Sequence, residues 1–115
     1  MEAGAMFVYE KSIFKGAELT ISDGVAAHMC TDEVFDAEAR LCLQRFLQQD
    51  WGDLSPQARR SNDLLLDQHL EPVLGLYNTS LGRVVVSASC YIQGQYEMVE
   101  MSLYKEVYNL YMVHK

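Results

Sequence analysis

Two stretches of the chain repeat apolar residues with the period of an α-helix. In residues 31–49 one face is formed by Phe35, Ala39, Cys42 and Phe46. Thr31 is the expected N-cap of this helix, and the acids after it suit the positive end of the helix dipole. A second main helix is expected over residues 55–70, because Ser55 can cap it and Pro56 fits the first helical position. A short helix is expected over residues 22–29, capped by Ser22 or Asp23.

The second half of the chain has the composition of a sheet. Strands are expected over residues 72–77, 83–90 and 96–104, joined by a hairpin loop at 78–82 and a turn at Gln93-Gly94. The almost continuous apolar run in 83–90 is typical of a central strand. Residues 106–112 carry tyrosines at helical spacing, but their Tyr and Val content favours a strand.

Near the N-terminus, residues 7–10 and 18–22 are expected to form a short strand pair, with a turn at Lys15-Gly16. The pattern therefore predicts an α+β fold, in which two main helices pack on a three- to four-stranded antiparallel meander. The 115 residues predict one domain. Residues 1–5 are expected to be disordered or foreign to the natural protein.

The charge balance is acidic, with 16 carboxylates against 9 lysines and arginines and a formal net charge of −7. This excess opposes direct binding to nucleic acid and to anionic membranes, both of which attract clustered basic residues. It suits a basic protein partner, or simply solubility. No secretory signal and no apolar run of membrane-spanning length is present in the sequence, so a cytoplasmic location is expected.

Candidate chemistry is sparse, and neither catalysis nor a metal or other cofactor is expected. Cys30, Cys42 and Cys90 lack the spacing of a zinc site and are expected to be reduced thiols. The sequence has no nucleophile elbow and no glycine-rich phosphate loop. A small enzyme that gathers Asp50, Asp53 and His69 in one pocket is a third, weaker hypothesis.

Tyrosines and methionines are concentrated towards the C-terminus, where five of the seven tyrosines lie between Tyr91 and Tyr111. Their rings can pack across strands within the core. Tyrosine and methionine are also enriched at protein interfaces, so an interface with another protein or a second copy is the alternative.

The segment QQDWGDLSPQARRSND, residues 48–63, contains the only tryptophan, Trp51, between Asp50 and Asp53. It follows one expected helix and includes the start of the next, and Gly52 permits a tight turn. We interpret it as a helix–loop–helix corner in which Trp51 packs against Leu54 and the sheet.

The same segment resembles a family of small uncharacterised proteins of bacteria, plasmids and phages. The family pattern reads F-L-x-R-H-x-x-G-D-W-G-[DE]-L-S-x-x-D-x-x-x-N, and the resemblance covers roughly residues 19–89. The matching residues are Arg45, Asp50, Trp51, Gly52, Asp53, Leu54, Ser55 and Asn62. Phe46 stands where the family has histidine, so no role of that histidine transfers. The resemblance implies an accessory protein of a mobile genetic element, a setting in which small acidic proteins often block host-defence complexes.

The leading functional hypothesis is a non-catalytic protein that binds a protein partner through acidic residues or tyrosines. A specific version is an inhibitor of a CRISPR or restriction complex that occupies a basic, nucleic-acid-handling groove. The candidate residues are Asp32, Glu33, Asp36, Glu38, Asp50, Asp53, Tyr104, Tyr108 and Tyr111. The alternative is a structural homodimer joined through the C-terminal sheet, with no inhibitory role.

Overall fold

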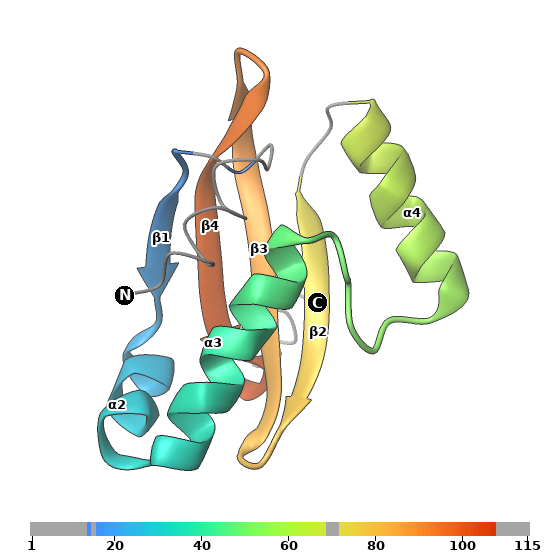
Figure 1. Ribbon diagram of the computed structural model, residues 1–115. Coiled ribbons are helices and arrows are strands. Elements are labelled where there is room, and N and C mark those ends of the chain that lie inside the picture. Colours follow the sequence, from blue (N-terminus) through green and yellow to red (C-terminus); the bar gives the residue numbers. More distant parts are fainter. Residues whose placement is uncertain (1–13, 15, 69–71, 108–115) are drawn as a thin grey trace.

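The computed structural model describes residues 14, 16–68 and 72–107, which form helices beside a four-stranded sheet (Figure 1). The strands are β1 (Glu18–Ile21), β2 (Val73–Thr79), β3 (Gly82–Ile92) and β4 (Gln95–Leu103). The helices are α2 (Asp23–Thr31), α3 (Glu33–Leu47) and α4 (Pro56–Asp67). This arrangement confirms the predicted α+β class.

The order of strands in the sheet is β1-β4-β3-β2. The expected antiparallel meander is present, since β2 pairs with β3 and β3 with β4 in antiparallel register. The sequence pattern placed β1 in a separate N-terminal strand pair and did not predict that it joins this sheet, where it lies parallel to β4. β1 lies far from β4 in the sequence, and no local turn joins the two strands. Residues 7–10, the expected partner of β1, lie outside the described residues.

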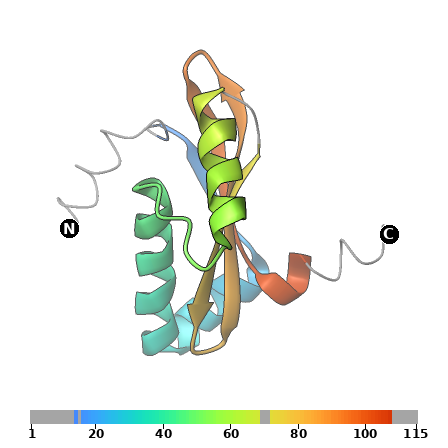
Figure 2. The same cartoon turned by 90° about the vertical axis from the view of Figure 1, so that its right-hand side faces the viewer.

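Helix α3 lies on one face of the sheet, α2 follows the end of β1 and packs against α3 and β4, and α4 lies along the free edge of β2 (Figures 1 and 2). The core fills the space between α3 and the sheet. It is built from the apolar stripe of α3 and from alternate strand residues, among them Val73, Tyr77, Val84, Val86, Val99 and Met101. Each of these strand residues is at most 1% exposed, so the side of β2, β3 and β4 that carries them faces the core.

Helix starts follow local capping chemistry. Ser22 caps α2 by accepting a hydrogen bond from the Val25 N–H, and Ser55 caps α4 through the Ala58 N–H. The prediction of Thr31 as the N-cap of α3 was wrong, because Thr31 is the last residue of α2. Asp32 is extended at φ −136° and accepts the Phe35 N–H at 3.0 Å, so it caps α3 instead.

The regular alternation of the long hairpin is interrupted near its tip. Cys90 has φ +60°, and the buried positions of β4 shift from Val99 to Tyr96, three residues away. Tyr96 consequently reaches the helix side, where its ring packs on Phe14. After β4 the chain forms a helical turn over residues 104–107. The strand expected at 106–112 was therefore wrong at 106–107, and its remainder lies outside the described residues.

Candidate functional site

Residues 48–63, which we call the tryptophan corner, connect α3 to α4 and pack against the sheet. Trp51 is 3% exposed, and its ring meets Phe46 edge-on at 5.3 Å between centroids. Its indole Nε1–H donates to Asp63 on α4 at 2.9 Å. Leu54 packs, partly buried, against the same core. These contacts confirm the interpretation of residues 48–63 as a corner between two helices.

The corner also closes part of the free edge of β2. The Leu76 N–H donates to the Trp51 carbonyl at 3.0 Å, and the Leu76 carbonyl accepts the Asp53 N–H at 2.6 Å. Asn62, 6% exposed on α4, donates to the Leu74 carbonyl and accepts the Leu74 N–H. Unpaired edge groups invite the addition of a further strand. Because these backbone groups are bonded, a partner strand cannot add to β2 at Leu74 and Leu76.

Asp50 is held within the corner by charge and by backbone contacts. The Arg45 guanidinium donates to its carboxylate at 2.8 Å, and the Gly52 N–H donates to it at 3.1 Å. The hydrogen bond from Arg45 is the main cause that lowers the pKa of Asp50. The Tyr77 hydroxyl donates to the Asp50 carbonyl, and burial raises the pKa of Tyr77. Asp50 therefore fixes the turn.

The other candidate acids are spread over α3 and the corner, and the structure does not bring them into one site. Asp32 caps α3, Asp36 pairs with Arg40 at 3.1 Å, and the Glu38 carboxylate accepts the Ser80 hydroxyl and N–H. Asp53 accepts a hydrogen bond from Asn78, and Glu33 is exposed in the first turn of α3. Within the described residues, each of these acids except Glu33 thus has a hydrogen-bond or ion-pair partner.

The tyrosines separate into core and surface residues. Tyr77 and Tyr96 are fully buried, and Tyr91 packs partly buried on the core. Tyr104 is 37% exposed, while Tyr108 and Tyr111 lie outside the described residues. Core packing thus accounts for two rings of the tyrosine-rich region, Tyr91 and Tyr96, and Tyr104 is the described candidate at the surface.

Side chains of metal-ligating type are scattered over the described residues. No group of three or more His, Cys, Asp or Glu side chains suited to a metal ion occurs among them. His69, the proposed partner of Asp50 and Asp53, lies outside the described residues. No helix within the described ranges has the length and apolar character needed to cross a membrane.

The second face of the sheet, which the sequence pattern did not single out, is not covered by α2, α3 or α4 (Figure 2). We call it the open face. It carries two rows of directly paired residues across the strands. One row is Thr20, Glu100, Ser87 and Leu74, and the other is Ser102, Val85 and Leu76. The open face is therefore apolar towards β2 and polar towards β4 and β1.

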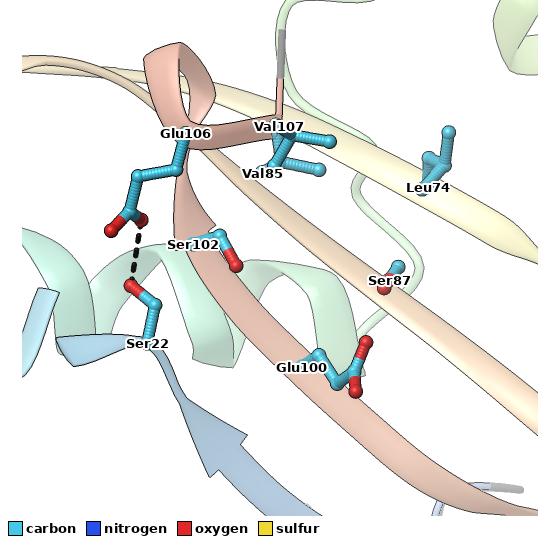
Figure 3. A pocket seen from close by; sticks show the side chains of 8 residues that line it. All are labelled: Ser22, Leu74, Val85, Ser87, Glu100, Ser102, Glu106 and Val107. Carbon is cyan, nitrogen blue, oxygen red and sulfur yellow. Dashed lines mark hydrogen bonds between the residues drawn. The ribbon is translucent and has the colours of Figure 1, made fainter. Parts of the chain in front are cut away.

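A groove of about 390 Å³ lies on the open face, and the helical turn after β4 forms one of its walls (Figure 3). Its lining residues are Ser22, Leu74, Val85, Ser87, Glu100, Ser102, Glu106 and Val107. A smaller hollow of about 130 Å³ adjoins it and shares Leu74, Val85 and Val107. None of these lining residues, which come from the described part of the chain, is basic. The groove thus combines an apolar floor with an acidic side.

The two carboxylates of the groove differ in their bonding. Glu106 accepts the Ser22 hydroxyl at 2.8 Å and the Leu103 N–H at 2.9 Å, which ties the final turn to the start of α2. Glu100 is exposed, and within residues 14, 16–68 and 72–107 its side chain has no hydrogen-bond or ion-pair partner. Glu100 is therefore the carboxylate that a ligand can engage without breaking a contact of the fold.

Comparison with known proteins gives no family for this chain: no protein-family model, curated protein or solved structure matches it. The resemblance to the D-W-G-[DE]-L-S family therefore stays a prediction. The geometry accounts for most of that motif in structural terms, since Arg45, Asp50, Trp51, Ser55 and Asn62 each hold the corner together.

Proposed function

We propose that the chain is a non-catalytic protein-binding domain that holds a basic segment of a protein partner on its open face. The observation that supports this most is the groove, in which apolar and acidic side chains meet and no basic side chain occurs among the described lining residues. Burial of Leu74 and Val85 would supply the hydrophobic contribution to binding, and Glu100 the electrostatic one.

Charge also argues for a foreign basic partner over a second copy of this chain. In a symmetric dimer joined through the open face, the same patch lies on both sides of the interface. Each copy would then bring its own Glu100 and Glu106 into the same interface, and the described lining of the groove offers no basic side chain to pair with them. These carboxylates would repel more strongly once the interface excludes water. The net charge of −7 on each copy opposes this dimer further. The structural homodimer thus remains the weaker alternative.

The family resemblance suggests a biological setting for this binding. We propose that the chain is an accessory protein of a mobile genetic element that inhibits a host CRISPR or restriction complex. Proteins that handle nucleic acid carry basic surfaces for phosphates. An acidic protein with a basic-binding groove can compete for such a surface.

A pull-down from bacterial lysate at increasing salt concentration tests the proposed function. The bait is the tagged chain, compared with Glu100→Lys on the open face and with Glu33→Lys as a matched control on α3. We expect the wild type and Glu33→Lys to retain a basic protein at low salt, and Glu100→Lys to lose it. That protein is then identified, purified and titrated against the three baits to obtain its Kd. Recovery of no basic partner, or equal retention by Glu100→Lys, contradicts the proposal.

Light scattering on the purified chain addresses the alternative. We expect a monomer at high protein concentration. A dimer that Glu100→Lys abolishes would replace the binding proposal with the homodimer.

A further inference from the structure

We propose that the groove contains a subsite for one lysine or arginine side chain of the partner. The aliphatic stem lies on Val85 and Leu74, and the cationic group lies against Glu100. The proposal rests on the open face being the binding face, and it adds which side chain is recognised and by which residues.

The positions of the groove residues suit a long side chain with an apolar stem. Leu74, Ser87 and Glu100 form one row across β2, β3 and β4, and Val85 lies diagonally from Glu100 in the next row. Diagonal neighbours on adjacent strands lie roughly 7–8 Å apart, within reach of long side chains. Lysine and arginine bury their stems on apolar surface and keep the charge near water. A side chain that crosses Val85 towards β4 therefore places its cation beside Glu100.

The polar surroundings also favour a cation over a neutral or anionic group. The Ser87 hydroxyl is next to Glu100 across the strands, and Ser102 lies on the same face of β4. Hydroxyl oxygens can accept hydrogen bonds from an ammonium or guanidinium group. Glu106 adds negative charge at the other end of the groove while its own bonds to Ser22 and Leu103 stay in place. Figure 3 shows both carboxylates together with the three serines.

The experiment is a titration of the full ¹⁵N-labelled chain with small molecules, monitored through its amide chemical shifts. The molecules represent the alkyl stem and the cationic group of the side chain, together or singly. Hexylammonium has both features, 1-hexanol only the stem, and methylammonium only the charge. We expect saturable shifts at Val85, Ser87, Glu100 and Ser102 with hexylammonium, and weaker binding of the other two probes. Exposed ion pairs contribute modestly, so Glu100→Gln should weaken hexylammonium about 2- to 5-fold. Glu33→Gln, the matched control on α3, should leave its affinity unchanged.

The subsite is overturned if 1-hexanol binds as tightly as hexylammonium, if Glu100→Gln has no effect, or if no saturable shift occurs at these amides. A nuclear Overhauser contact between the Val85 methyl groups and Leu110 or Met112 also overturns it, because the chain itself would then occupy the groove.

The outcome for the subsite and the outcome for the proposed function can be told apart. If hexylammonium does not bind but a partner sensitive to Glu100→Lys is recovered, the subsite is wrong and the proposed function stands. If hexylammonium binds as expected but no partner is recovered, the subsite stands and the proposed function is wrong.

Discussion

Gly52 is the residue on which the tryptophan corner depends most. It has φ +78°, and a Cβ atom there would collide with the Leu76 carbonyl oxygen and lie 2.7 Å from the Tyr77 ring. A side chain at this position meets both a backbone penalty and a steric one. We predict that Gly52→Ala lowers the free energy of unfolding by about 2–5 kcal/mol, measured by urea denaturation.

Gly94 supplies the matched control for this prediction. It has φ +91°, but a Cβ atom at this position would have no other atom within 4 Å, so Gly94→Ala meets the backbone penalty alone. We expect that substitution to cost about 1–2 kcal/mol. Equal losses for the two variants would mean that the clash of the added Cβ atom with Leu76 and Tyr77 costs no stability.

The start of α3 depends on one side chain, and the structure assigns that role to Asp32. Its carboxylate accepts the Phe35 N–H, whereas the Thr31 hydroxyl donates back to the Ala27 carbonyl within α2. We predict that Asp32→Ala lowers the free energy of unfolding by about 1 kcal/mol, as loss of an N-cap does. Thr31→Ala should cost clearly less in the same urea denaturation experiment. The reverse order of the two losses would restore Thr31 as the cap.

Local chemistry explains which elements could be predicted from the sequence. Ser55 followed by Pro56 fixes the start of α4, and the apolar run of residues 83–90 marks the central strand β3. Thr31 and Asp32 are both good caps, so their sequence alone does not decide between them. The helical turn at 104–107 was missed because the Leu103 N–H is held by the Glu106 carboxylate, a contact that Tyr and Val propensities do not reveal.

Features that depend on the assembled chain were not predictable from local patterns. The parallel pairing of β1 with β4 joins segments about eighty residues apart, between Glu18 and Met98. The groove arises because α4 packs along the edge of β2 and does not cover the open face, which carries Leu74, Val85 and Glu100. In the sequence, Glu100 is one acid among 16, so its role as the free carboxylate of the groove follows only from the fold.

The burial of Cys42 makes its reactivity a measure of how often the whole domain opens. Cys42 is 4% exposed in the core, and burial raises its pKa to about 11, whereas Cys30 is exposed on α2. The thiolate is the reactive form, and at pH 8 a thiol with that pKa is only about one thousandth ionised. We predict that N-ethylmaleimide modifies Cys30 at least about a hundredfold faster than Cys42 at pH 8, measured by pulse labelling and peptide mapping.

Labelling at increasing urea concentration tests whether Cys42 reacts only when the whole domain unfolds. Trp51 is buried at the joint of α3, α4 and the sheet, so its fluorescence reports loss of the same core that encloses Cys42. If Cys42 becomes accessible only by global unfolding, its labelling rate should rise with urea in parallel with the Trp51 transition. Cys30 should show little dependence on urea below that transition. Rapid labelling of Cys42 without urea would show that α3 separates from the sheet while the rest of the domain stays folded.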